Sequence, residues 1–260
     1  MYKKKYFGHF IKRWSFYLIC CFIYDYYNSK NIFKAMINVS ERNMFLQKSN
    51  EVLSEIYDKF QKIKSVNLND FDCNKTVLII IDMVNGFAKG GALSSKRILS
   101  INGRIAALSD SCSKLGIEKI AFADSHAENS PEFKVYPKHC VRGDWESMLT
   151  DEIIKSGKCV LIEKNSTNGF IESRFLEWLE KNEDIDNFII VGNCTDICVQ
   201  QFSLSLKAYY NMKNREKNII VVKDLVETYD QDFHYSELMS LISLYNMNIN
   251  GIDIVSTITF

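Results

Sequence analysis

From residue 74 onward, short apolar runs alternate with longer amphipathic stretches. Six of the runs are rich in Val and Ile and are bounded by polar residues, as expected of strands buried on both faces. The runs lie at Val77–Ile81, Ile117–Ala123, Val160–Ile162, Phe188–Val191, Ile219–Val222 and Ile252–Val255. Helical stretches are expected between them, near residues 99–115, 171–182, 196–213 and 233–246. The alternation predicts one α/β domain over residues 74–260, with helices on both faces of a six-stranded, mainly parallel sheet.

Two further segments precede this domain. Residues 44–73 contain an amphipathic helix, because apolar residues recur every three or four positions from Met44 to about Lys64, and we expect it to pack on the core. Residues 1–43 form an N-terminal extension with a basic start. Its apolar segment, Trp14–Tyr24, is shorter than the roughly 20 residues that span a bilayer, and no small-residue cleavage site follows it. The helix pattern leaves open a native protein that starts at Met44, without the extension.

The composition is that of a soluble globular protein. The 260 residues include 32 basic and 32 acidic ones, and 47% are hydrophobic, which excludes a disordered or collagen-like chain. Zero net charge provides no attraction to nucleic acid or to a membrane surface, so we expect neither as a partner. A chain of this length builds a core without crosslinks, so its eight cysteines do not indicate a disulfide framework. We therefore expect a reducing, cytoplasmic location.

Polar residues directly follow several of the apolar runs, where a parallel sheet would bring them to one edge. Asp82 follows the first run, Lys164 the third and Asp224 the fifth, and Cys198 lies in the turn after the fourth. The start of a helix at Cys198 would favour its thiolate, with Thr195 or Asp196 as the capping residue. A carboxylate at a partly desolvated strand end, such as Asp82, can take a proton from a thiol. Taken singly, Cys198 could instead be a small core residue, and Lys164 an exposed lysine.

Histidine is scarce in this chain and unevenly placed. Two of the four histidines, and both prolines, lie within residues 126–139. Asp124 and His126 stand two residues apart after the second run, and His139 follows with Glu132 between them. These residue types suit a divalent metal of borderline softness, such as zinc, iron or manganese. An Asp-x-His pair alone is a weak signal, because such pairs arise often by chance.

Six motifs follow one another in chain order between Thr76 and Ser256. They are Ile80-Ile-Asp-Met-Val-Asn-Gly-Phe87, Asp124-Ser-His126, Ser130-Pro-Glu-Phe133, Tyr136-Pro-Lys-His-Cys-Val-Arg-Gly143, Glu163-Lys-Asn165 and Gly192-Asn-Cys-Thr-Asp-Ile-Cys-Val199. In this order they resemble the isochorismatase-like cysteine hydrolases and, within them, the nicotinamidases. The resemblance implies a three-layer Rossmann-like fold. It also implies hydrolysis of a C–N amide bond, in which nicotinamide becomes nicotinate and ammonia, a reaction of NAD salvage.

The resemblance assigns a catalytic triad to Asp82, Lys164 and Cys198. Cys198 would attack the amide carbonyl, Asp82 would relay the proton to the departing amine, and Lys164 would hold charge between them. Water would then release the acid from a thioester. The same resemblance implies a cis peptide bond between Asn193 and Cys194, with the backbone amides of Cys194 and Cys198 as the oxyanion hole.

The resemblance also assigns a metal site and a substrate site. The bound ion would orient the pyridine ring, and zinc is favoured over iron or manganese as the cofactor. Phe87 and Tyr136 match the aromatic positions that sandwich the ring, although a Trp is common at the second. The metal-ligand positions are Asp124, His126, Glu132 and His139.

Other functions stay open at this point. Another amidase of the family, acting on a carbamoyl compound or a ureide, would keep the same triad. A non-catalytic binding protein could keep the fold, but no triad residue is lost here. The isochorismatase branch itself lacks the metal histidines and the catalytic cysteine, both of which this chain has. The expected partner is a small-molecule amide, and a homo-oligomer is left open because surfaces of this fold often pair.

Overall fold

The computed structural model describes residues 38–260, and the chain divides into two units after Ile56. A helix occupies residues 38–61, so the predicted helix is present but begins before Met44. Of the predicted extension over residues 1–43, residues 1–37 lie outside the described part. The predicted packing of this helix on the core stays a prediction. None of the helices described has a segment long and apolar enough to cross a membrane.

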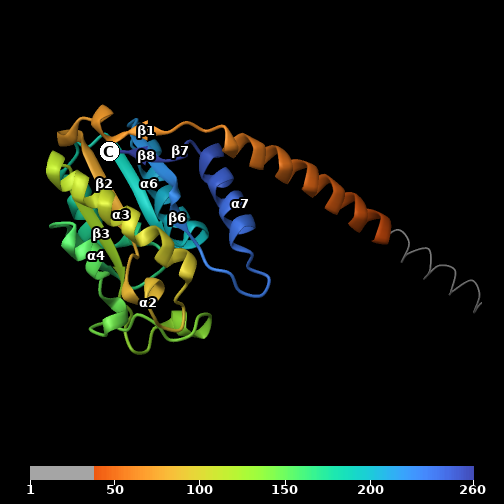
Figure 1. The fold of residues 1–260 in the computed structure, drawn as a ribbon, viewed down its shortest axis with the longest axis horizontal. Coiled ribbons are helices and arrows are strands. Elements are labelled where there is room, and N and C mark those ends of the chain that lie inside the picture. The colour runs from red at the N-terminus through yellow and green to blue at the C-terminus, as the bar shows by residue number, and fades with distance from the viewer. Residues whose placement is uncertain (1–37) are drawn as a thin grey trace, which may run out of the picture. The chain divides into compact units, whose positions relative to one another are not determined.

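A six-stranded sheet lies at the centre of the larger unit (Figure 1). Its strands are β2 (Thr76–Ile81), β3 (Glu118–Asp124), β4 (Val160–Lys164), β5 (Asn187–Asn193), β6 (Asn218–Glu227) and β7 (Asp253–Val255). They are ordered β4-β3-β2-β5-β6-β7, and every neighbouring pair is parallel. A separate parallel pair joins β1 (Val66–Asn67) to β8 (Ile258–Thr259). The six predicted strands and the α/β fold are thus confirmed.

The four predicted helices are also present. The α-helices that follow β2 along the chain are α2 (Asn85–Ala88), α3 (Lys96–Leu115), α4 (Asp151–Lys155), α5 (Ser173–Lys181), α6 (Gln200–Met212) and α7 (Ser236–Ile249). Short 3-10 helices occupy Leu68–Asp70, Cys73–Lys75, Pro131–Lys134, Trp145–Ser147 and Gly169–Ile171, and a π-helix, η6, occupies Thr195–Val199. The sequence did not predict α2 and α4, because helices of four or five residues are too short to show a periodic pattern.

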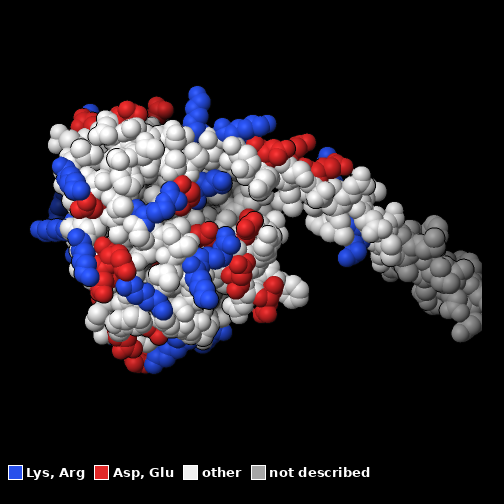
Figure 2. Space-filling model, viewed as in Figure 1, with Lys and Arg blue, Asp and Glu red and all other residues white. Residues whose placement is uncertain are grey.

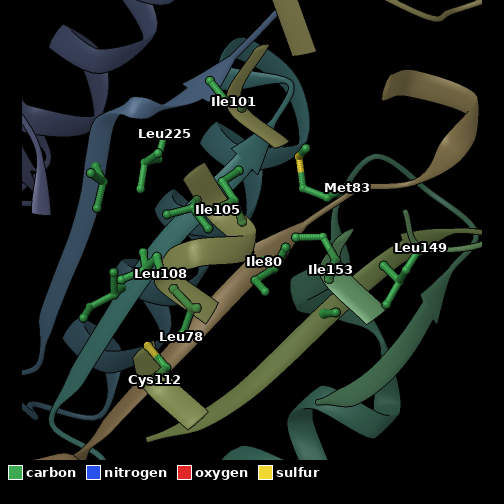
Figure 3. Packing of buried hydrophobic residues seen from close by; sticks show 14 of the residues in the cluster. Leu78, Ile80, Met83, Ile101, Ile105, Leu108, Cys112, Leu149, Ile153 and Leu225 are labelled. Carbon is green, nitrogen blue, oxygen red and sulfur yellow. The ribbon is translucent and has the colours of Figure 1, made fainter. Parts of the chain in front are cut away.

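Both faces of the sheet are covered by helices. Every residue of β2 is buried, and alternate side chains point to opposite faces. On one face Leu78 and Ile80 join a cluster with apolar residues of α3 and α4, which Figure 3 shows from close by. On the other face the ring of Phe122, from β3, packs edge-on against that of Phe175, from α5, with ring centroids 5.3 Å apart. The ring centroid of Phe202, from α6, lies 5.1 Å from that of Phe122. Each such buried side chain contributes roughly 1.5–3 kcal/mol to folding.

The carboxyl ends of β2 and β5 lie unusually close together. Gly192, near the end of β5, has φ +119, and a Cβ at this position would lie 2.0 Å from the carbonyl oxygen of Ile81. Only glycine fits such an approach. It brings the next residue, Asn193, to Asp82, whose carbonyl oxygen accepts a hydrogen bond from Asn193 Nδ2 at 2.6 Å.

The pairing of β5 with β6 shifts register near the same edge. Ile190 pairs with Val221, but Gly192 pairs with Val226, so β6 advances five residues where β5 advances two. This bulge lets β6 continue to Glu227, well beyond the apolar run that predicted it.

Charged side chains of both signs are interspersed over the face of the molecule in Figure 2, as the balanced composition predicts.

Candidate active site

Three strand-end residues meet at the carboxyl edge of the sheet. Lys164, the last residue of β4, extends its ammonium to 2.9 Å from Asp82 Oδ2 and 3.7 Å from Cys198 Sγ. All three side chains are buried, and Asp82 and Lys164 are at most 1% exposed. The structure thus brings together the three residues that the sequence selected from separate strands.

The backbone places each of these groups. Asp82 follows β2 with φ +53, a left-handed conformation that Asp tolerates better than most residues, and its amide donates to the Phe122 carbonyl at 3.0 Å. Cys198 lies in η6, directly after the Asn193–Cys194 peptide bond, which is cis as the resemblance implied. The residue at the N-cap of η6 is Cys194, and no side chain caps this helix. The predicted cap by Thr195 or Asp196 is therefore wrong, because the Asp196 carboxylate bonds to His234 instead.

Burial governs the ionisation of the acid and the thiol. Burial raises the pKa of Asp82 to about 6, although the Lys164 cation acts in the opposite direction. Burial also raises the pKa of the Cys198 thiol well above its ordinary value, and the nearby Lys164 only partly offsets this. The resting thiol is therefore neutral at neutral pH. Burial thus opposes the thiolate that we expected the helix start to favour.

Lys164 joins the acid and thiol to a second carboxylate. Its Nζ lies 2.7 Å from Asp124 Oδ1 and donates a hydrogen bond to the Ser166 carbonyl oxygen at 3.0 Å. Burial alone would lower the pKa of Lys164, but the carboxylates of Asp124 and Asp82 raise it well above the ordinary value. Burial would likewise raise the pKa of Asp124, yet Lys164 and two histidines hold it well below the usual range. Lys164 is thus a fixed cation between two acids.

Two histidines converge on the other oxygen of Asp124. His126 Nε2 lies 2.9 Å and His139 Nε2 3.1 Å from Asp124 Oδ2, and the three side chains offer ligand atoms within 4.8 Å of one another. The Nδ1 atoms face acceptors, Asn165 Oδ1 at 3.2 Å and the Pro137 carbonyl oxygen at 2.7 Å.

These second partners fix the chemistry of the cluster. An acceptor at Nδ1 requires that nitrogen to carry the proton in a neutral imidazole, which leaves a lone pair on each Nε2. Two lone pairs and a carboxylate oxygen then point at one another, an arrangement that a cation stabilises. The donor set of two imidazoles and one carboxylate is one that divalent zinc accepts. The residues present therefore fit a divalent metal.

Glu132, the fourth predicted ligand, lies apart from the other three. It belongs to the 3-10 helix Pro131–Lys134, is half-buried, and lines the same cavity as Asp124 and His139. Burial raises the pKa of its carboxyl group. Its carboxylate is not part of the group of converging ligand atoms found among the described residues.

A cavity of about 40 Å³ lies beside the thiol and the metal-ligand cluster. The ring centroid of Phe87, from α2, lies 5.7 Å from that of His139, and the ring centroid of Tyr136 lies 6.2 Å from that of the same histidine. Both predicted aromatic residues therefore line the cavity. Its full lining is Phe87, Leu93, Asp124, Glu132, Tyr136, His139, Thr167, Cys194, Ile197, Cys198 and Tyr229.

The sequence missed Tyr229, which enters the cavity from the end of β6. We expected Asp224 at that strand end, because the apolar run stops at Val222. Asp224 instead forms an ion pair with Arg104 and is not among the cavity residues. The bulge in β6 explains the error, since it moves the end of the strand to Glu227, two residues before Tyr229.

Comparisons with known proteins show the family and the fold of the chain. A family model described as the isochorismatase domain matches residues 76–249. Nicotinamidase 1 of Arabidopsis thaliana is 30% identical over 213 residues, which cover 70% of this chain and 86% of that protein. The structure of N-carbamoylsarcosine amidase from Thermoplasma acidophilum is similar with a TM-score of 0.56 and 26% identity, over 70% of this chain and 95% of that one. The pyrazinamidase of Pyrococcus horikoshii, solved in complex with zinc, shares the fold with a TM-score of 0.59 and 22% identity, over 72% of this chain and 99% of that one.

Proposed function

The chain belongs to the isochorismatase family and is an amide-bond hydrolase, and from this membership we propose that it converts nicotinamide to nicotinate and ammonia. The observation that carries the proposal is the adjacency of a buried thiol to a histidine–carboxylate cluster, with Lys164 in contact with both. A nicotinamidase needs both parts, one to cleave the amide and one to orient the ring. The 30% identity to a plant nicotinamidase supports the same substrate.

The proposed reaction begins at Cys198. Its thiol proton passes to the Asp82 carboxylate as sulfur attacks the amide carbon, and Asp82 then gives the proton to the departing nitrogen, which leaves as ammonia. The acyl group remains on sulfur as a thioester. Water, deprotonated by Asp82, cleaves the thioester and returns the thiol. In each step the positive charge of the Lys164 ammonium offsets the negative charge on the Asp82 carboxylate and on the Cys198 sulfur.

The carbonyl oxygen gains negative charge during both steps. We assign its stabilisation to the backbone amides of Cys194 and Cys198, which lie in and beside the turn that carries the nucleophile. Both residues also line the cavity, so a bound amide would lie against this turn.

The ring of the substrate would lie between Phe87 and Tyr136. A divalent ion, for which we favour zinc, would bind the pyridine nitrogen when held by Asp124, His126 and His139. Asn165 and the Pro137 carbonyl bind the Nδ1 atoms of His126 and His139 and so fix the orientation of both imidazoles. The pyridine ring of the substrate would therefore meet a metal site whose geometry is already set. A role for Glu132 as a further ligand stays a prediction.

A carbamoyl amino acid is the second candidate substrate, because one similar structure is an N-carbamoylsarcosine amidase. Such a substrate carries a carboxylate that needs a cation or several donors. Among the described residues that line the cavity, none is Lys or Arg, and three are Phe or Tyr. The three aromatic rings favour a planar aromatic amide, and the only cation that a substrate carboxylate would meet among these lining residues is the proposed metal ion.

Ammonia release from the purified, zinc-loaded protein tests the proposal. We expect turnover of nicotinamide and of pyrazinamide, and little of N-carbamoylsarcosine or another ureide. Release from the carbamoyl compound alone would replace the proposal with the second candidate. A matched preparation of Cys198→Ala controls for a contaminating amidase.

We also propose a cytoplasmic location and a place in NAD salvage. The six cysteines in the described part of the chain are all free thiols, as a reducing compartment would keep them.

A further inference from the structure

The loop between β6 and α7 forms a compact turn beside the cavity. Gln231 and His234 exchange two backbone hydrogen bonds, each donating its amide to the carbonyl of the other. Asp230 Oδ1 accepts a hydrogen bond from the amide of Ser236, the first residue of α7, at 2.8 Å. The turn is therefore anchored to α7 and is not a loose connection.

His234 joins this turn to the catalytic turn. Its Nδ1 donates to the carbonyl oxygen of Tyr229 at 2.8 Å, and its Nε2 lies 2.7 Å from Asp196 Oδ2. Asp196 belongs to η6, two residues before Cys198, and its side chain is only 5% exposed. Since both ring nitrogens face acceptors, the ring satisfies both contacts when it carries two protons, and it then forms a charge-assisted pair with the buried carboxylate of Asp196.

The same imidazole supports the ring of Tyr229. The two rings are stacked, with centroids 4.0 Å apart and planes inclined by 5°. Tyr229 also lines the cavity, together with Phe87 and Tyr136. His234 therefore fixes Tyr229 at two points, the backbone carbonyl and the aromatic ring. His234 is itself outside the cavity lining, so any effect on substrate must pass through Tyr229 or Asp196.

From these contacts we propose that Tyr229 is a third aromatic contact for the substrate ring and that His234 is its positioning residue. The proposal rests on the proposed function for its substrate. Phe87 and Tyr136 lie near the metal ligand His139, whereas Tyr229 comes from the β6 edge, which carries no metal ligand. Tyr229 thus favours planar aromatic amides over aliphatic ones, independently of the metal.

Steady-state kinetics of four variants test this assignment. We expect Tyr229→Ala and His234→Ala each to raise the KM for nicotinamide about fivefold to tenfold, the loss of one aromatic contact, with kcat changed less than twofold. Tyr229→Phe keeps the ring and should behave like the wild type. Phe233→Ala is the matched control, since Phe233 is the adjacent residue and is fully exposed.

The double variant Tyr229→Ala/His234→Ala separates positioning from a general structural effect. If His234 acts through Tyr229, the double variant has the KM of Tyr229→Ala alone; multiplied effects would overturn the assignment, as would an unchanged KM in either single variant. Should His234→Ala unfold at the assay temperature, His234→Gln, which keeps a donor toward Asp196, replaces it and should raise KM in the same direction.

Hydrogen exchange gives a readout that does not need catalysis. In His234→Ala, the amides of residues 229–234 should exchange at least tenfold faster than in the wild type, whereas Phe233→Ala should leave the rest of the turn unchanged. Unchanged exchange in His234→Ala would refute positioning even if the enzyme turned over nicotinamide. If the wild type hydrolyses no pyridine amide but exchange does accelerate, the proposed function fails and the positioning role stands.

Discussion

Replacing Asp82 by Asn tests the role of the buried acid with little change in shape. Asn has nearly the volume of Asp but neither its charge nor its ability to accept the thiol proton. A thiol with the ordinary pKa of 9.0 is about 1% ionised at pH 7, and the pKa of Cys198 is higher still. Without a base, less than about 1% of the enzyme would carry a thiolate, so kcat should fall at least 100-fold. General bases typically contribute 10²- to 10⁴-fold, which agrees with this bound.

The pH dependence of ammonia release makes this test specific. Burial raises the pKa of Asp82 to about 6, so below pH 6 its carboxyl group is protonated and cannot accept the thiol proton. In the wild type, kcat/KM should therefore rise with pH through about 6 and then level off, and Asp82→Asn should lack this rise. Melting temperature and metal content, measured on the same samples, control for folding. A variant that kept more than a tenth of the wild-type kcat, or the same rise near pH 6, would refute the assignment of Asp82 as the base.

Three further substitutions have defined outcomes. Cys198→Ala should abolish ammonia release while metal content and melting temperature stay unchanged, and turnover above background would exclude Cys198 as the nucleophile. His139→Ala should lower the bound zinc measured after dialysis and raise KM before it changes kcat; full metal occupancy would contradict the ligand assignment. Gly192→Ala should lower the free energy of unfolding by about 2–5 kcal/mol, because its φ is +119 and the added Cβ meets the Ile81 carbonyl oxygen. An unchanged urea midpoint would contradict this reasoning, because it would mean that β2 and β5 move apart at Gly192 without loss of stability.

Most of the fold could be predicted from the apolar runs, because strands buried on both faces leave few polar residues inside them. Ile79 and Ile80 show why: each faces a different helical layer, and both are fully buried. The rule that parallel strands end at one edge then brought Asp82, Lys164 and Asp124 together without any structure. These groups lie at strand ends, so local sequence determines where they are.

What could not be predicted depends on contacts between distant segments. The stack of His234 on Tyr229, and its bond to Asp196, join two loops with no shared sequence pattern. The burial that raises the pKa of the Cys198 thiol comes from the whole fold, so the sequence around the helix start could not show it. The apolar run likewise ended the predicted strand at Val222, because the polar residues Lys223 and Asp224 interrupt it, although β6 continues through the bulge to Glu227.

The bulge in β6 makes the shape of the cavity depend on the number of residues in this strand, because that number sets the position of Tyr229. The three additional residues amount to about 10 Å of strand, at roughly 3.3 Å per residue. A deletion or insertion there would slide Tyr229 along the sheet edge, and any odd change would also reverse the faces of the side chains after it. Substitutions within the bulge should therefore be tolerated far better than changes in its length. A length change in β6 is therefore expected to alter the lining of the cavity while Asp82, Lys164 and Cys198, which lie on other elements, keep their places.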